Sequence, residues 1–315
     1  MKPKISVILL NYNNEHFTVD CLHSLVHVTY PNLEPIVVDN GSKPESIQAV
    51  KAAAGNAIVL ELGKNLGFTG GNNAGLKYAL DNGADYIILL NNDTIVAPDM
   101  FDILIDTMEK DPSIGVVGPM IYYYDAPDLI WSVGGKIDWR SGLTHMVGLN
   151  EQDKGQYGDL PQTTDFVTGC ALLARREVWE KVGGLDENFF IYYEETEWCV
   201  RASRAGFKIV YVPSAMMWHK IGLDARATTP GYYYYMTRNR LLFLHKTRAG
   251  MRSWMGITTE LTRTFLAGRY GQSGKIAVTY GVSCCGPSKT IRWVNTARRL
   301  FRPSLDMQLQ LFLTG

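Results

Sequence analysis

The stretch Tyr86-Ile87-Ile88-Leu89-Leu90-Asn91-Asn92-Asp93-Thr94 indicates the fold class of this chain. It begins with a continuous apolar run, which is typical of a strand buried on both faces of a parallel sheet. The carboxylate of Asp93 follows the run closely. Because open α/β sheets bind their ligands at the carboxyl ends of their strands, we expect Asp93 to lie in a ligand-binding crevice.

Strand-like and helix-like patterns alternate over about the first 120 residues. Alternation of this kind predicts an α/β fold with a mostly parallel sheet and helices on both faces. The expected strands are residues 5–10, 35–39, 57–62 and 86–90, and the expected helices are residues 15–28, 44–54, 70–80 and 98–110.

The second part of the chain has a less regular pattern. Residues 125–164 are rich in Gly, Asp and Gln. We expect a long loop there, and long loops in compact domains often bind ligands. Further strands are expected at residues 115–124, 166–174 and 207–212, further helices at 175–182 and 194–205, and a helical, amphipathic part from Gly231 onward.

The composition is that of a globular protein with a sizeable core. The chain has 315 residues, of which 46% are hydrophobic and 20% are charged, as in ordinary soluble domains. No apolar run approaches the roughly 20 residues that a membrane-spanning helix needs, and no secretory signal is visible. The five scattered cysteines suit free thiols better than a disulfide framework. We therefore expect a cytoplasmic protein.

The net charge of zero conceals an uneven distribution. From residue 245 onward there are eleven basic residues and two acids, a net charge of +9, so residues 1–244 carry −9. A basic segment on an acidic body indicates an anionic partner such as a membrane, a lipid phosphate or a nucleic acid. The alternative is a solvated basic face packed against the acidic body.

Polar residues stand at or just beyond the ends of three expected strands: Asn11, Asp39 and Asp93. Because parallel strands end at the same edge of a sheet, we expect these side chains to converge on one crevice. A carboxylate such as Asp39 can accept a hydrogen bond from a nucleobase or a ribose hydroxyl. Asp39 could instead brace the Asn40-Gly41 turn.

Residues 65–75 form a glycine-rich stretch that lets the backbone approach a ligand and opens a helix, where a phosphate could bind. A nicotinamide site is the alternative. The glycines do not follow the G-x-G-x-x-G order, however, and the stretch comes after the third expected strand rather than the first. An NAD-dependent oxidoreductase is therefore disfavoured.

Asp93 and His219 are the candidate metal ligands. A diphosphate bound to Mg²⁺ or Mn²⁺ supplies several ligand oxygens itself, so one carboxylate and one imidazole would be enough. The imidazole favours Mn²⁺ without excluding Mg²⁺. The alternative for His219 is a buried histidine beside Trp218 that binds nothing.

The acidic cluster Glu194-Glu195-Thr196-Glu197 could supply a general base, since neighbouring carboxylates raise each other's pKa. On a helix, Glu197 lies four residues before Arg201, and we expect the two to pair. Glu194 and Glu195 project about 100° apart on such a helix, so we expect only one of them to face the crevice.

The ordered set of these motifs resembles the family 2 inverting glycosyltransferases of GT-A fold, in particular their bacterial rhamnosyltransferase-like branch. The resemblance covers about residues 4–245. The matching segments are residues 7–13, 37–42, 65–67, 71–75, 90–93, 169–171, 183–187, 193–195 with Arg201, 218–219 and 238–240.

The resemblance implies roles for individual residues. Asp93 would be the metal-binding carboxylate of the Asp-x-Asp position, which begins with Asn91 in this chain, and His219 would be a second metal ligand. Glu195 would be the catalytic base at a position where Asp is usual, and Glu194 is a possible substitute. The implied nucleotide-sugar-binding set is Asn11, Asp39, Gly71, Asn73, Asn92 and Asp93.

We therefore expect a hexosyltransferase that moves a sugar, with inversion and with Mn²⁺ or Mg²⁺, from a nucleotide-diphosphate donor to a glycan or lipid-linked acceptor in polysaccharide biosynthesis. The branch suggests dTDP-rhamnose as the donor. A catalytically inactive nucleotide-sugar-binding module is the alternative, because Asn91 leaves one carboxylate fewer.

The resemblance and the charge pattern together predict the domain organisation. Residues 1–244 would be the GT-A domain, with a nucleotide-sugar-binding half at 1–120 and an acceptor and catalytic half at 121–244. Residues 245–315 would be a helical basic segment that contacts the anionic inner face of the cell membrane or a second copy in a homodimer. We expect no nucleic acid partner.

Overall fold

The computed structural model describes residues 2–222, 230–247, 250 and 258. The chain separates into two compact units, residues 1–249 and 250–315, and nearly all of the second unit lies outside the described residues. The predicted basic segment, residues 245–315, therefore lies outside the described residues except for residues 245–247, 250 and 258, and the division at residue 244 stays a prediction. Within the described residues, no helix is both long and apolar enough to cross a membrane.

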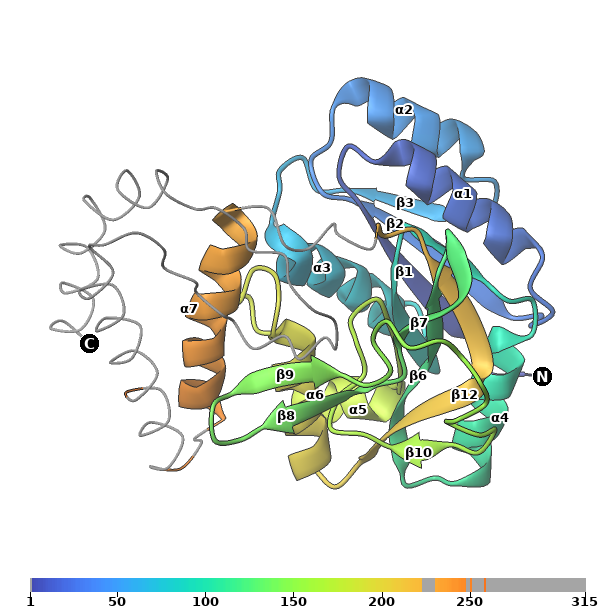
Figure 1. Ribbon diagram of the computed structural model, residues 1–315. Coiled ribbons are helices and arrows are strands. Elements are labelled where there is room, and N and C mark those ends of the chain that lie inside the picture. The colour runs from blue at the N-terminus through green and yellow to red at the C-terminus, as the bar shows by residue number, and fades with distance from the viewer. Residues whose placement is uncertain (1, 223–229, 248–249, 251–257, 259–315) are drawn as a thin grey trace, which may run out of the picture. The chain divides into compact units, whose positions relative to one another are not determined.

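A ten-stranded mixed sheet forms the centre of the first unit (Figure 1). The strand order is β10-β12-β6-β11-β4-β1-β2-β3, with β5 added to β12 and β7 added to β6, and β8 and β9 form a separate hairpin. The strands are β1 (Ile5–Asn11), β2 (Leu33–Asp39), β3 (Ile58–Glu61), β4 (Tyr86–Asn91), β5 (Thr94–Val96), β6 (Ile114–Tyr123), β7 (Ala126–Ser132), β8 (Gly135–Asp138), β9 (Leu143–Met146), β10 (Gln162–Thr163), β11 (Ala171–Arg175) and β12 (Lys208–His219).

The direction of the strands decides where the site lies. Strands β3, β2, β1 and β4 are parallel neighbours, and β6 and β12 are also parallel to each other. Strand β11 runs antiparallel between β4 and β6, so β6 and β12 point in the same direction as β4. The carboxyl ends of β1, β2, β4 and β12 therefore meet at one edge of the sheet, together with the start of β11.

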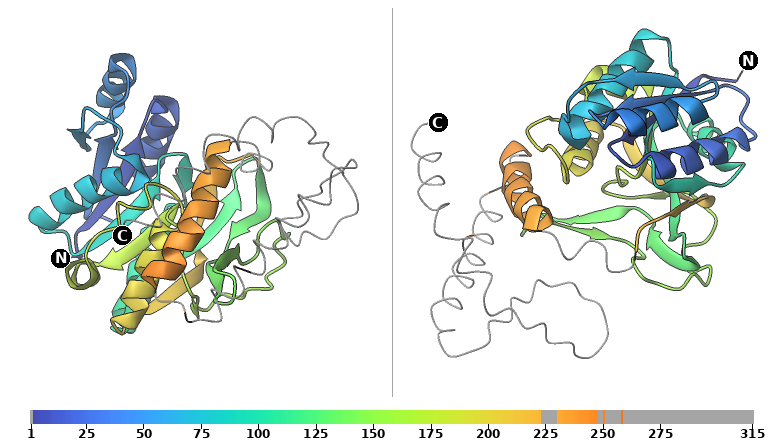
Figure 2. Two further views of the ribbon diagram at one scale, coloured as in Figure 1. Left: turned by 90° about the vertical axis from the view of Figure 1, so that its left-hand side faces the viewer. Right: turned by 90° about the horizontal axis from the view of Figure 1, so that it is seen from above.

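Helices cover both faces of this sheet (Figure 2). On one face, Val7 and Leu9 of β1 belong to a buried cluster with residues of α1 and α4. On the other face, Ile8 lies under α3. This arrangement confirms the predicted α/β class. The helices are α1 (Glu15–Val26), α2 (Pro44–Ala53), α3 (Gly67–Asp81), α4 (Met100–Lys110), α5 (Arg176–Val182), α6 (Glu194–Arg204) and α7 (Pro230–Lys246).

Residues 125–164 are more ordered than the sequence indicated. They contain β7, β8, β9 and β10, so the prediction of a long loop was wrong. Short antiparallel pairs of this kind depend on partners elsewhere, as in the bonds from Tyr122 Oη to Asp153 Oδ2 (2.6 Å) and from Tyr123 Oη to Asn150 Oδ1 (2.6 Å). Local composition does not show such partners.

Strand β12 continues well beyond the predicted end at residue 212. Its register against β6 shifts between Val212 and Met216, after which pairing resumes and reaches His219. Pro213 interrupts the apolar pattern at this irregularity, and a proline is tolerated where a strand is bulged. The irregular strand carries His219 to the same edge as Asp93.

Helix α3 packs closely on the sheet because it has glycines where it faces β1 and β2. A Cβ atom at Gly75 would lie 2.6 Å from Ile8 Cγ2 and 2.9 Å from Val38 Cγ2, closer than real Cβ atoms approach. We expect Gly75→Ala to reduce the free energy of unfolding by about 1–3 kcal/mol, because the helix must move away from the sheet. Chemical denaturation measures this change.

The matched control is Gly231→Ala in α7, where an added Cβ meets no atom of the described residues within 4 Å. That substitution is expected to be neutral or to stabilise by up to about 1 kcal/mol, since alanine favours a helix. Equal effects of the two substitutions would contradict the close packing of α3.

Candidate active site

Asn11 and Asp39 lie side by side at the ends of β1 and β2, where they are paired in register. Asn11 Nδ2 donates a hydrogen bond to Asp39 Oδ1 (3.0 Å). Asp39 Oδ2 accepts hydrogen bonds from the backbone N–H groups of Gly41 (3.2 Å) and Ser42 (3.0 Å). Asp39 is buried and braces its own turn. This is the structural role expected as the alternative to a contact with a nucleoside.

A buried hydroxyl connects this pair to the end of β4. Thr18 of α1 donates from Oγ1 to Asn11 Oδ1 (2.8 Å), and Asn92 Nδ2 donates to Thr18 Oγ1 (2.8 Å). A continuous chain of hydrogen bonds therefore runs from Asp39 to the residue beside Asp93. The sequence analysis missed Thr18, because one threonine within a helical pattern carries no motif.

Asp93 and His219 meet although 126 residues separate them. Strand β5 pairs antiparallel with the end of β12, which sets His219 opposite Thr94. Asp93 Oδ1 lies 3.0 Å from His219 Nε2, with the Asp93 side chain 28% exposed and the His219 side chain 3% exposed. The carboxylate therefore reaches solvent, while the imidazole is held behind it.

These two side chains fit a divalent metal ion. Asp93 Oδ1 and His219 Nε2 are hydrogen-bonded at 3.0 Å, and about 3.0 Å is also the spacing of neighbouring ligands on an octahedral ion with bonds of about 2.1 Å. The imidazole stands edge-on to Trp131 at 4.7 Å between ring centroids. Its Nδ1 is buried and has no hydrogen-bond partner among the described residues. In that part of the chain no three His, Cys, Asp or Glu side chains cluster as a metal site, so a bound diphosphate would have to complete the coordination.

Glu195 is placed at the same edge through the start of β11. The backbone N–H of Asn91 donates to the carbonyl of Cys170 (2.9 Å), which sets Gly169 beside the end of β4. A Cβ atom added to Gly169 would lie 3.5 Å from Glu195 Cβ and 3.4 Å from the ring of Phe68. The half-buried Glu195 therefore stands beside Gly169, one residue before the Cys170 carbonyl that is bonded to the end of β4.

Glu194 is more deeply buried than Glu195. It is 4% exposed, and its Oε2 atom has no hydrogen-bond partner among the residues that the structure describes. Burial, and secondly the neighbouring Glu195 carboxylate, raise the pKa of Glu194 well above its usual range. Only one of the two acids is deeply buried, in accordance with their expected divergence on the helix.

Glu197 has the structural role that its spacing predicted. Its two carboxylate oxygens share the single N–H of Arg201 Nε, at 3.0 and 2.9 Å. Arg201 also donates from Nη2 to the carbonyl of Gly184 (2.8 Å). The pair thus ties α6 to the loop before it.

The buried Glu194 should make stability depend on pH. Because its pKa in the folded protein lies above the ordinary value near 4.5, its contribution to the free energy of unfolding is full below that value and is lost as pH rises through the folded pKa. Glu194→Gln should remove this dependence and add about 1–3 kcal/mol at pH 8, because no buried charge remains.

Denaturant unfolding between pH 4 and pH 8 measures this effect. The control is Glu177→Gln, which removes an equal charge from an exposed residue of α5 and should leave the pH dependence of the wild type unchanged. If the free energy of unfolding of Glu194→Gln varied with pH as that of the wild type does, the link between the protonation of Glu194 and stability would be contradicted.

The glycine-rich stretch is accounted for largely by packing. A Cβ at Gly71 would lie 2.3 Å from Leu10 Cδ1. Asn73 Nδ2 donates to the carbonyl of Leu185 (2.8 Å), and its Oδ1 accepts from the N–H of the same residue (2.9 Å). At the start of α3, the N–H of Thr69 donates to the carbonyl of Phe190 (3.2 Å). The nucleotide-sugar role of Gly71 and Asn73 stays a prediction.

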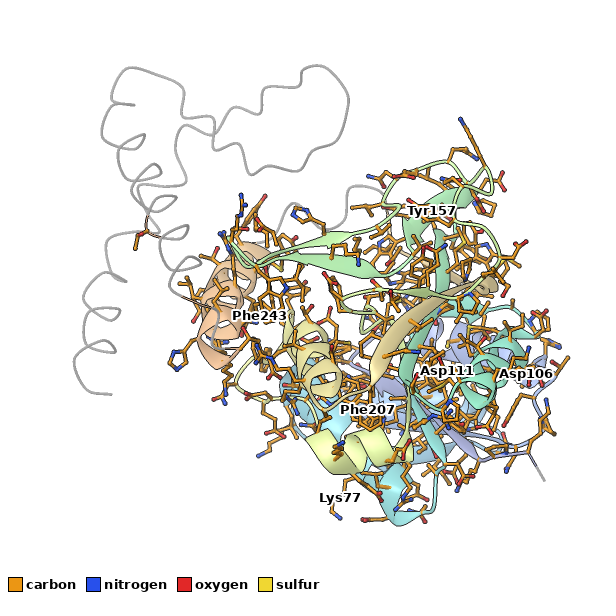
Figure 3. All side chains as sticks on the ribbon, turned by 90° about the horizontal axis from the view of Figure 1, so that it is seen from below. Lys77, Asp106, Asp111, Tyr157, Phe207 and Phe243 are labelled. Carbon is orange, nitrogen blue, oxygen red and sulfur yellow. The ribbon has the colours of Figure 1, made fainter. Side chains whose placement is uncertain are left out.

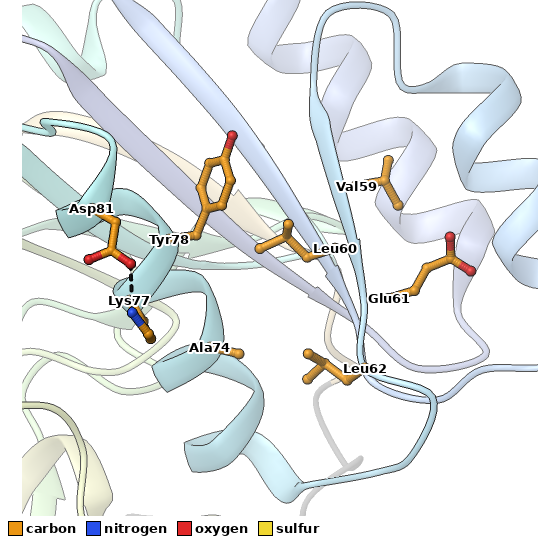
Figure 4. Close-up of a pocket in the computed structure, with 8 residues that line it drawn as sticks. All are labelled: Val59, Leu60, Glu61, Leu62, Ala74, Lys77, Tyr78 and Asp81. Carbon is orange, nitrogen blue, oxygen red and sulfur yellow. Dashed lines mark hydrogen bonds and ion pairs between the residues drawn. The ribbon is translucent and has the colours of Figure 1, made fainter.

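A shallow groove of about 440 Å³ lies between the edge strand β3 and α3 (Figure 4). An ion pair between Lys77 and Asp81 (2.6 Å) lies within it. None of the predicted site residues lines this groove. Asn11, Asp39, Asp93 and His219 lie instead at the carboxyl edge of the sheet.

Comparison with known proteins identifies relatives of the chain. Residues 6–183 match the model of the family described as Glycosyl transferase family 2. The dTDP-rhamnosyl transferase RfbF of Shigella flexneri is 26% identical over 254 residues, which cover 78% of this chain and 81% of the relative. The N-acetylglucosaminyl-diphospho-decaprenol L-rhamnosyltransferase of Mycobacterium tuberculosis is 28% identical over 246 residues, which cover 70% of this chain and 76% of the relative.

The fold also occurs among solved structures. GalNAc-T7, solved with UDP, GalNAc and Mn²⁺, superposes with a TM-score of 0.61 at 19% sequence identity. The match covers 77% of this chain and about half, 48%, of the length of that protein. This similarity confirms the expected GT-A type of fold.

Proposed function

The chain belongs to glycosyl transferase family 2, and from this premise we propose that it transfers a hexosyl group from a nucleotide-diphosphate donor to a hydroxyl of a glycan or lipid-linked acceptor. The family match and the rhamnosyltransferase relatives make it a glycosyltransferase. The observation that carries the detailed proposal is the convergence of Asp39, Asp93, His219 and Glu195 on one edge of the sheet.

The proposed reaction is a single displacement with inversion. Glu195 accepts the proton of the acceptor hydroxyl, and the acceptor oxygen forms its bond to the anomeric carbon of the donor sugar. The bond from that carbon to the diphosphate oxygen breaks, and the nucleoside diphosphate leaves with the electron pair. One base is enough for this route, whereas a retaining glycosidase needs a pair of carboxylates.

Asp93 and His219 are the residues that would hold Mn²⁺ or Mg²⁺. A divalent ion there would supply positive charge for the departing diphosphate. GalNAc-T7 was solved with Mn²⁺ and UDP, which supports the proposal. Asn11 and Asp39 would contact the nucleoside, with the hydroxyl of Thr18 keeping Asn11 in place.

dTDP-rhamnose is the proposed donor. One relative is named as a dTDP-rhamnosyl transferase and another as an N-acetylglucosaminyl-diphospho-decaprenol L-rhamnosyltransferase. Both similarities extend over more than two thirds of this chain. A lipid-linked acceptor would also explain the net charge of +9 from residue 245 onward, since a basic segment binds anionic lipid. Co-sedimentation with anionic liposomes at low salt tests that contact, and protein that stays in the supernatant would argue against it.

The donor is tested by measuring nucleoside diphosphate release from a panel of nucleotide sugars, with and without Mn²⁺, and with lipid-linked and free glycan acceptors. Release with dTDP-rhamnose that rises when acceptor is added supports the proposal. Binding of a nucleotide sugar with no release of nucleoside diphosphate under any condition would favour the inactive binding module. That module is the alternative because Asn91 stands where the Asp-x-Asp motif has a carboxylate.

A further inference from the structure

The segment that leads into the acidic cluster has an unusual backbone. Phe190, Tyr192 and Tyr193 have φ angles of +65°, +70° and +72°, in the left-handed region that bulky residues seldom adopt. Tyr193 is the residue directly before α6, which begins at Glu194. The conformation of this segment, residues 188–193, therefore sets the direction in which Glu194 and Glu195 project.

Nothing in residues 188–193 favours this conformation by itself. The segment reads Asn-Phe-Phe-Ile-Tyr-Tyr and contains no glycine, the residue that adopts a positive φ without cost. Such a backbone persists only when surrounding structure holds it in place. Its support must therefore come from contacts with other elements.

The principal support is Asn239 of α7. Its Nδ2 lies 2.9 Å from the carbonyl oxygen of Phe189, 2.7 Å from that of Ile191 and 2.8 Å from that of Tyr192. The two hydrogens of one amide group thus serve three acceptors of the segment. Asn239 is 0% exposed, so no water competes for these bonds.

Further contacts hold the segment between α3 and α7. The carbonyl of Phe190 accepts a hydrogen bond from the N–H of Thr69 in α3 (3.2 Å). On the other side, the Phe190 ring stacks on Tyr235 of α7 with centroids 5.4 Å apart and planes 15° apart. Helix α7 is itself fixed by the buried ring of Phe243 (labelled in Figure 3), whose centroid lies 5.6 Å from that of Tyr193.

We propose that Asn239 is a positioning residue for the catalytic base. Its side-chain amide holds residues 188–193 in a conformation with three left-handed residues, and α6 then begins where Cβ of Glu195 lies beside Gly169. Asn239 has no role in proton transfer and acts through the backbone alone. The inference rests on the proposed role of Glu195.

The test compares the wild-type protein with Asn239→Asp. Asp has the shape of Asn but lacks the donating amide, so this variant removes the hydrogen bonds without creating a cavity. We expect kcat for sugar transfer to fall by about 10²-fold, the loss that accompanies a misplacement of about 1 Å, while the KM for the donor stays within about 3-fold. The proposed nucleotide contacts lie at the ends of β1 and β2, which Asn239 does not touch. We therefore expect kcat to fall while KM stays nearly constant.

The control variant is Thr247→Val, directly after α7. Thr247 is buried and donates from Oγ1 to the carbonyl of Phe243 (2.6 Å), so its loss destabilises the same region without touching residues 188–193. We expect a smaller drop in Tm than in Asn239→Asp, because only one hydrogen bond is lost, with kcat nearly unchanged. If Asn239→Asp keeps kcat within about 3-fold of the wild type, or lowers kcat only as much as Thr247→Val does, the inference is overturned.

Hydrogen–deuterium exchange separates this inference from the proposed function, because it needs no substrate. Amides of residues 188–195 should exchange faster in Asn239→Asp than in the wild type and in Thr247→Val. Faster exchange in a protein that transfers no sugar would mean that the proposed function fails while Asn239 still orders the segment. Unchanged exchange would refute the positioning role whatever the activity.

Discussion

Replacement of Glu195 by Gln is expected to lower kcat for sugar transfer by about 10²–10⁴-fold, the usual contribution of a general base. Glutamine has nearly the same shape as glutamate but cannot accept the proton of the acceptor hydroxyl. The KM for the donor should change little, because Glu195 lies beside Gly169 at the start of β11 and not at the ends of β1 and β2. Steady-state transfer to acceptor, with nucleoside diphosphate binding as the check on folding, measures both parameters.

Glu194→Gln is the matched control, since it is the same substitution one residue away. Glu194 is buried and burial favours its neutral form, so this variant should keep kcat within about 10-fold, well short of the loss of a base. Full activity in Glu195→Gln together with a large loss in Glu194→Gln would transfer the role of base to Glu194. If both variants keep full activity, catalysis by this acidic cluster is refuted.

Asp93→Asn is expected to lower kcat/KM by about 10²-fold or more and to weaken Mn²⁺-dependent binding of nucleoside diphosphate. The expected loss corresponds to several kcal/mol of charge stabilisation that a bound ion provides. Asparagine keeps the hydrogen bond to His219 Nε2 possible but removes the negative charge that attracts a cation. Calorimetric titration of nucleoside diphosphate at several Mn²⁺ concentrations, beside the transfer assay, measures both effects.

A double-substitution cycle with His219→Gln tests whether the two residues hold the same ion. Their atoms lie 3.0 Å apart, so the two losses should be less than additive, because the second substitution removes a ligand from a site that has already lost its metal. Asn91→Asp is the opposite control, since it restores a carboxylate at the Asp-x-Asp position and should strengthen Mn²⁺ binding. A shared metal site would be contradicted if the losses in kcat/KM were additive and if Asp93→Asn kept the Mn²⁺ dependence of nucleoside diphosphate binding.

Most of the regular elements could be predicted from local sequence patterns. The apolar run of residues 86–90 forms β4, and the helical periodicity of residues 194–205 forms α6. Period-2 and 3.6-residue patterns are local consequences of which face of a strand or helix is buried. The convergence of Asn11, Asp39 and Asp93 followed in the same way, because parallel strands share a direction.

The contacts that complete the site could not be predicted in this way. The pairing of Asp93 with His219 depends on the register between β5 and β12, after an irregularity in β12 that resembles the end of a strand. The order within residues 125–164 depends on antiparallel partners that local composition does not indicate.

The sequence alone determined the α/β class, the edge of the sheet at which the candidate site lies and the acids that could serve it, because those features follow from short-range periodicity and from strand direction. Only the tertiary structure decided that Glu194 is buried while Glu195 stands beside Gly169, and that Asn239 holds the segment before them. The left-handed backbone of that segment is unfavourable for its own residues. Its conformation therefore comes from hydrogen bonds that a helix nearly fifty residues away supplies.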